Sequence, residues 1–113
     1  MNKTILFLSF SVLFLFIVSG FTLQAQTPAG DYKVGDTKCT IKLDISSEWK
    51  VYWEGVKGSS NLSYKENMVT GDQVWVEKRK GKVVGNFILN NDYTSGRYVR
   101  FEDDVKMDVI KLP

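Results

Sequence analysis

The feature that most constrains this chain is a period of two in its hydrophobic pattern, which runs from about residue 30 to the end. In the clearest segment, residues 38–45, every second residue is apolar and the residues between are polar. This is the period of a β-strand that turns one face to a core and the other to water. The inward residues predicted for this strand are Cys39, Ile41, Leu43 and Ile45.

Turn-forming residues interrupt this pattern often enough to predict eight short strands joined by hairpin-length connections. No window after residue 25 shows a helical period. Eight strands are enough for a meander to close on itself and abolish its edges. We therefore expect an all-β fold, a small eight-stranded antiparallel up-and-down barrel, with a two-sheet β-sandwich as the alternative.

The predicted interior of this barrel is crowded with aromatic rings. Gly85, on the inner face, would leave room for one of them. A filled interior argues against a large ligand cavity. The inward rings are those of Tyr32, Trp49, Trp53, Tyr64, Phe87 and Phe101.

The dipeptide at 80–81 fixes the expected register of one hairpin, because Gly81 suits the positive φ that a two-residue turn requires. Counted along a regular hairpin, this turn pairs Val76 with Gly85 and Trp75 with Asn86. Trp75 then faces outward. A slip of one residue would exchange the two faces. The core-facing residues of this hairpin are Val74, Val76 and Phe87.

The segment 90–96 is dense in turn formers and predicts the next connection. Pairing Leu89 with Arg97 across it places Gly85 opposite Phe101 and leaves Tyr98 and Arg100 outward. The last strand then has the inward residues Val105, Met107 and Val109, and the alternation breaks at Ile110, which predicts a bulge or the closing seam of the barrel.

This register gathers one candidate interaction surface on the outer face of three consecutive strands. An outward Trp beside aliphatic, Tyr and Arg side chains has the composition of an interface core. Contact with a terminal segment or with a homodimer partner would also explain it, and so would a stacked sugar. The candidate residues are Trp75, Val84, Asn86, Ile88, Tyr98 and Arg100.

Residues 1–25 have the pattern of a secretory signal peptide. Lys3 supplies a positive start, residues 5–18 form a hydrophobic run, and Ala25 offers a small residue for cleavage. An uncleaved membrane anchor is the alternative. The expected organisation is a signal peptide over 1–25 and one β-barrel domain over 26–113, exported to the periplasm or the outside of the cell and without a membrane span after cleavage.

Composition excludes several classes of function. Without Lys3 the chain carries 14 Lys and Arg against 13 Asp and Glu, so no broad field attracts nucleic acid. The chain has no His, the commonest general base and metal ligand. Its single Cys, Cys39, faces inward, where a thiol behaves as a small hydrophobe. We therefore expect no catalytic residues, no metal and no cofactor.

Two short segments resemble known families of small barrels. The residues Gly30-Asp31-Tyr32 look like the start of lipocalin-like barrels, so the predicted domain would be a lipocalin-like miniature. The segment Ser95-Gly96-Arg97-Tyr98 is similar to the Ser-Gly-x-Arg-Tyr segment of periplasmic inhibitors of C-type lysozyme, which are small exported eight-stranded barrels. One residue of that segment and the paired cysteines of that family are absent here.

These patterns together predict a small exported, non-catalytic binding or interaction protein. Its partner would be a protein or a glycan, as for a hydrolase inhibitor or a glycan- or protein-binding module of the cell envelope. A structural or self-assembling envelope component, for example a homodimer, is the alternative.

Overall fold

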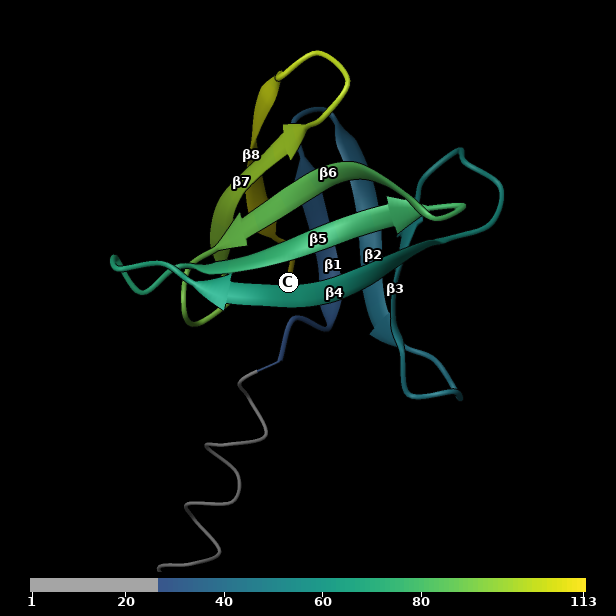
Figure 1. Cartoon of the computed structure of the whole chain (residues 1–113), viewed down its shortest axis with the longest axis horizontal. Coiled ribbons are helices and arrows are strands. Elements are labelled where there is room, and N and C mark those ends of the chain that lie inside the picture. The colour runs from purple at the N-terminus through teal and green to yellow at the C-terminus, as the bar shows by residue number, and fades with distance from the viewer. Residues whose placement is uncertain (1–26) are drawn as a thin grey trace, which may run out of the picture.

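The computed structural model describes residues 27–113, which form a closed antiparallel barrel of eight strands (Figure 1). The predicted barrel is confirmed, and a two-sheet sandwich is not what the chain forms. The predicted signal peptide and its cleavage point lie outside the described residues. The strands are β1 (Gly30–Val34), β2 (Thr37–Leu43), β3 (Trp49–Trp53), β4 (Ser60–Asn67), β5 (Gln73–Arg79), β6 (Lys82–Leu89), β7 (Ser95–Arg100) and β8 (Lys106–Lys111).

Each strand pairs with its neighbours in sequence, and β8 pairs with β1 to close the barrel. Ile110 lies in this closing pair, opposite Lys33, and faces outward. The alternation therefore breaks at Ile110 because the closing seam of the barrel lies there. This is one of the two causes that were predicted. Within residues 27–113 no helix is long and apolar enough to cross a membrane.

The up-and-down order gives the barrel two ends with different connections. We call the end that carries the turns at 35–36, 54–59, 80–81 and 101–105 the Glu77 end, and the other the opposite end. Figure 1 shows the β5–β6 turn and the β7–β8 turn at the right and the top. The middle of the barrel is filled by buried side chains, among them Tyr32, Cys39, Ile41, Val51, Leu62, Phe87, Leu89 and Val109.

The β5–β6 hairpin has the predicted turn but not the predicted register. Lys80 and Gly81 both have positive φ, 53° and 80°, as in a type I′ turn, and Arg79 pairs with Lys82. The pairing then shifts by one residue, so that Glu77 and not Val76 lies opposite Gly85. Val84 is the extra residue, which makes this a β-bulge.

This bulge overturns the predicted orientation of β5. Trp75 pairs with Phe87 and is only 6% exposed, inside the barrel. The same face carries Glu77, whereas Val76 is half-buried on the other side. The chain therefore adopts the pairing shifted by one residue, in which the two faces of β5 are exchanged relative to the prediction.

Strand β7 is also shifted by one residue from the prediction. Leu89 pairs with Gly96, not Arg97, because Gly96 permits a close approach to β6: a Cβ there would lie 2.2 Å from the Ile88 carbonyl oxygen. Tyr98 therefore points inward and Phe101, predicted to be inward, is 62% exposed.

Other predicted core residues lie at the surface. Strand β2 ends at Leu43, which is exposed, and Ile45 follows in a turn and is fully exposed. The Asp44 carboxylate fixes this turn by accepting hydrogen bonds from the backbone N–H groups of Ser46 and Glu48. Further predicted inward residues that are exposed are Tyr64 and Val105.

Candidate functional site

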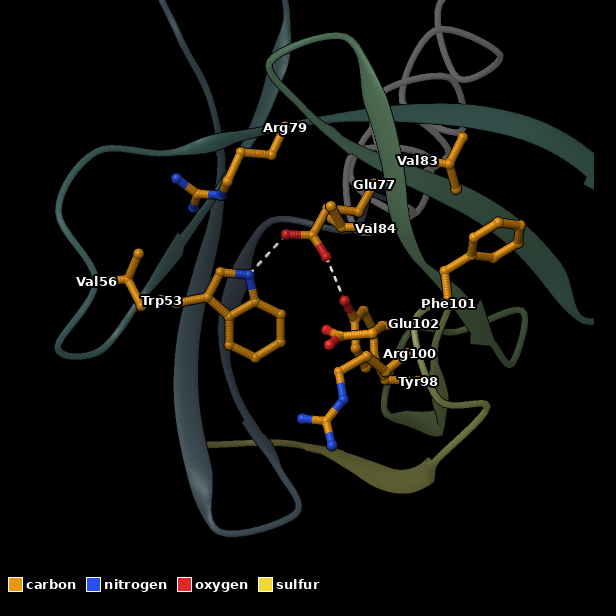
Figure 2. A pocket seen from close by; sticks show the side chains of 10 residues that line it. All are labelled: Trp53, Val56, Glu77, Arg79, Val83, Val84, Tyr98, Arg100, Phe101 and Glu102. Carbon is orange, nitrogen blue, oxygen red and sulfur yellow. Dashed lines mark hydrogen bonds between the residues drawn. The ribbon is translucent and has the colours of Figure 1, made fainter.

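The candidate site is a pocket of about 310 Å³ at the Glu77 end (Figure 2). Its walls come from β3, β5, β6 and β7 and from the two connections beside them. A volume of this size is at the lower limit of small-molecule sites. The lining residues are Trp53, Val56, Glu77, Arg79, Val83, Val84, Tyr98, Arg100, Phe101 and Glu102.

Glu77 is the central polar group of this pocket. It is 1% exposed, and each of its carboxylate oxygens accepts one hydrogen bond. The indole N–H of Trp53 donates to Oε2 at 2.7 Å, and the hydroxyl of Tyr98 donates to Oε1 at 2.6 Å. Among residues 27–113, no Lys or Arg forms an ion pair with this carboxylate. A buried carboxylate with only neutral donors is an unusual and costly arrangement.

Local packing explains how the three residues meet. Glu77 lies opposite Gly85, and a Cβ at position 85 would be 2.2 Å from the Tyr98 hydroxyl oxygen, so only Gly leaves space for that ring. Gly85 was predicted to leave room for one of the inward rings, but the ring that lies there is that of Tyr98, which was predicted to face outward. Trp53 stacks on Phe87, with ring centroids 6.0 Å apart, and meets Tyr98 edge-on at 5.3 Å.

The buried site suppresses ionisation of the groups around it. The pKa of the Tyr98 phenol is raised, first by burial and then by its hydrogen bond to Glu77. Burial also raises the pKa of the Cys39 thiol to about 12, and the charge of Glu77 adds to this effect. Cys39 is buried, as predicted. Neither group is therefore disposed to act as a nucleophile near neutral pH.

Two arginines complete the polar lining. Arg79 lies two residues after Glu77 on the same face of β5 and is half-buried. Its Nη2 atom is buried and has no hydrogen-bond partner among the described residues. Arg100, opposite Gly85 on β7, is held by Asp103 through hydrogen bonds of 3.0 Å from Nε and 2.9 Å from Nη2. In Figure 2 the Arg79 guanidinium lies to the left of the Glu77 carboxylate and the Arg100 guanidinium lies below it.

A smaller pocket of about 180 Å³ adjoins the first and shares Trp53, Tyr98 and Arg100 with it. Its remaining walls are Val34, Thr37 and Met107. The barrel is thus filled at its middle, as expected, and hollowed at the Glu77 end.

The opposite end has a pocket of about 360 Å³ lined by Trp49, Tyr64 and Trp75 among others. The Trp75 ring meets the other two edge-on, and its indole N–H is buried without a hydrogen-bond partner among residues 27–113. Lys and Arg are absent from the lining of this pocket, and its one carboxylate, Glu48, is exposed. The Glu77 end is therefore the better candidate for a specific site.

The predicted interaction surface does not form as one patch. Trp75 is buried at the opposite end, and Tyr98 is buried beside Glu77. Asn86 and Ile88 stay half-buried on the outward face of β6. Val84 and Arg100 line the pocket together with Tyr98. Three of the six predicted residues, Val84, Tyr98 and Arg100, therefore meet at the Glu77 end. They do so because the pairings of β5 with β6 and of β6 with β7 differ from the predicted ones.

Sequence reasoning missed Glu77, Trp53 and Arg79 as site residues. Trp75 was predicted to face outward, and Glu77, two residues further along the same strand, would share that face; the run Val74-Trp75-Val76 is apolar throughout and gives no signal against this orientation. The one available signal was the adjacent pair Val83-Val84, which breaks the alternation of β6 at the bulge.

Within residues 27–113, no group of three or more His, Cys, Asp or Glu side chains is placed to hold a metal ion. Comparisons with protein-family models, with curated proteins and with solved structures gave no match to this chain.

Proposed function

We propose that this protein is an exported, non-catalytic binding protein that holds a polar ligand at the Glu77 end of its barrel. The observation that carries the proposal is a buried carboxylate beside a buried, unpartnered guanidinium N–H, in a pocket that is open to solvent. Convergent polar groups on an apolar wall are the usual composition of a ligand site. The ligand is either a free small molecule or the end of a larger partner.

A binding role fits the pocket better than a catalytic one. The chain has no His, and burial raises the pKa values of both the Cys39 thiol and the Tyr98 phenol. Each oxygen of Glu77 accepts one hydrogen bond from a protein group, which holds the carboxylate in place. These features leave the pocket without an activated nucleophile.

The test is a ligand screen by NMR on the ¹⁵N-labelled protein, which observes the indole N–H of Trp53 directly. We expect bound ligands to shift this signal, and Arg79→Gln to abolish the shift. The matched control is Arg97→Gln, because Arg97 is an exposed arginine on the outer side of β7. Ligands that shift only Trp49 or Trp75 would move the site to the opposite end and overturn the proposal.

A self-assembling envelope component is the second candidate. At the opposite end, Ile45 and Val69 are fully exposed at the tips of two turns. Exposed aliphatic tips of this kind are suited to burial against a second copy of the chain. Mass in solution across a concentration series tests this function. A dimer that Ile45→Ser or Val69→Ser dissociates would favour it, and a monomer at all concentrations would exclude it.

A further inference from the structure

The pocket has both hydrogen-bond acceptors and a hydrogen-bond donor that no protein group uses. Each oxygen of a carboxylate can accept two hydrogen bonds, and each oxygen of Glu77 accepts only one. Arg79 contributes an N–H that has no acceptor among residues 27–113. A ligand that matches this pocket therefore carries donors and acceptors close together, as vicinal hydroxyl groups do.

The pocket is lined by charges of both signs. Glu77 and Glu102 line it together with Arg79 and Arg100, and Arg100 is already paired with Asp103. Glu77 and Arg79, which form no ion pair among residues 27–113 and are not exposed, have opposite charges. An anionic ligand would meet the buried carboxylate of Glu77, and a cationic ligand would meet the guanidinium of Arg79. A charge of either sign would thus be desolvated next to a like charge, which is costly in a partly buried site. The lining favours a ligand without net charge.

The remaining wall of the pocket is apolar and carries flat rings. Trp53 forms its inner side, and Phe101 and Val56, both exposed, stand at its rim. Exposed apolar side chains around a polar centre suit a ligand with a nonpolar face and polar edges. A pyranose ring has this shape, with C–H groups on its face and hydroxyl groups around its edge.

We propose that the Glu77 end binds a neutral saccharide ring, either a single sugar or the end of a chain. Glu77 accepts hydrogen bonds from its hydroxyl groups, Arg79 donates to them, and the ring lies against Trp53 and Phe101. This inference rests on the proposed binding function, for which it names the class of ligand. The volume of about 310 Å³ accommodates one or two rings, so a longer glycan would be held by its end.

The experiment compares three sugars that share the gluco ring and differ in charge. Glucose is neutral, glucosamine is a cation in slightly acidic buffer, and glucuronate is an anion. Each is titrated into the protein while the Trp53 indole N–H is followed by NMR. We expect the neutral sugar to bind at least about tenfold more tightly than either charged one. Arg79→Gln should weaken it by at least about tenfold, and Arg97→Gln should leave it unchanged.

The outcomes separate this inference from the proposed function. If a charged sugar or a non-saccharide ligand binds better and still shifts Trp53, the pocket is a binding site and the inferred ligand class is wrong. If the neutral sugar binds equally well to Arg79→Gln, the saccharide lies elsewhere and the inference fails. If neither the sugars nor a fragment library shifts Trp53, both proposals fail. Thermal unfolding of each variant verifies that it is folded.

Discussion

Replacement of Gly85 by Ala tests the register that creates the site. The new Cβ would lie 2.2 Å from the Tyr98 hydroxyl oxygen and 2.3 Å from Cζ, distances that no packing tolerates. Tyr98 is 5% exposed and hydrogen-bonded to Glu77, so its ring can move away from Gly85 only by breaking that hydrogen bond and turning into one of the two pockets that it lines. Overpacking costs about 1–3 kcal/mol, and a displaced ring would lose a hydrogen bond to a charged group, about 1.5–3 kcal/mol. Gly85→Ala should therefore destabilise the barrel by about 2.5–6 kcal/mol.

The effect of Gly85→Ala on the free energy of unfolding should change sign when Tyr98 is replaced by a smaller residue. In a Tyr98→Leu background the clash is absent, and Ala is favoured over Gly in a strand by about 0.5–1 kcal/mol. Urea unfolding followed by circular dichroism gives both free energies of unfolding, and their difference is the coupling between positions 85 and 98. We expect Gly85→Ala to be neutral or stabilising in this background.

A Phe101→Leu background is the matched control. Phe101 is exposed, so its truncation should not relieve Gly85→Ala. In the register expected from a regular hairpin, Gly85 would instead lie opposite Phe101, and this background would be the one that rescues. Equal losses in the parent protein and in the Tyr98→Leu background, or rescue by Phe101→Leu, would refute the observed pairing of β6 with β7.

Three further predictions follow from burial and from the chain's N-terminus. Trp75→Ala should cost about 3–5 kcal/mol, similar to Trp53→Ala, because both rings belong to the interior; a near-neutral result in urea unfolding would return Trp75 to the surface. Cys39 should resist aqueous thiol reagents in the native state and react in denaturant. Because burial raises the Cys39 pKa from 9.0 to about 12, the unfolded chain loses this proton first, so stability should fall as pH rises through that interval, and Cys39→Ala should flatten the decline. If residues 1–25 are a signal peptide, as proposed, intact-mass analysis of the protein expressed with them should show a chain that begins at Gln26, and a mass that includes residues 1–25 would contradict cleavage.

The sequence determines the barrel more firmly than it determines which side chains enter it. The eight strands and the type I′ turn at 80–81 could be predicted because a strict period of two and a Gly at positive φ each have one structural meaning. The faces of β5 and β7 could not. A single extra residue at Val84 reverses the orientation of β5, and no pattern in Val74-Trp75-Val76 opposes the reversal.

The shift in β7 has a similar physical origin. Gly96 faces the β6 backbone at a distance that no Cβ could occupy, and this contact sets the pairing. In the sequence, Gly96 indicates only the end of a turn-rich segment. Without the bulge at Val84, Glu77 would share the outward face predicted for Trp75, although it is the most buried charged residue of the described chain. The candidate site therefore depends on two local contacts that only the folded backbone reveals.

The polar triad of Trp53, Glu77 and Tyr98 is not needed to fill the barrel, and this yields a last prediction. Removing Glu77 alone would leave the buried Tyr98 hydroxyl unpaired, at about 1–3 kcal/mol, and would also leave the partly buried Trp53 indole N–H without its acceptor. Replacing all three residues together, by Trp53→Phe, Glu77→Leu and Tyr98→Phe, removes every polar group of the triad and leaves apolar side chains, with a marked loss of volume only at position 53. Replacing every partner of a buried hydrogen-bonded set by apolar groups of similar shape can be nearly neutral or stabilising. We expect the triple variant to be at least as stable as the parent protein in urea unfolding and to have lost ligand binding at the Glu77 end.

Such a result would mean that the triad is maintained at a cost to stability, as is usual for binding sites. A triple variant markedly less stable than the parent would instead assign Glu77 to holding β3, β5 and β7 together.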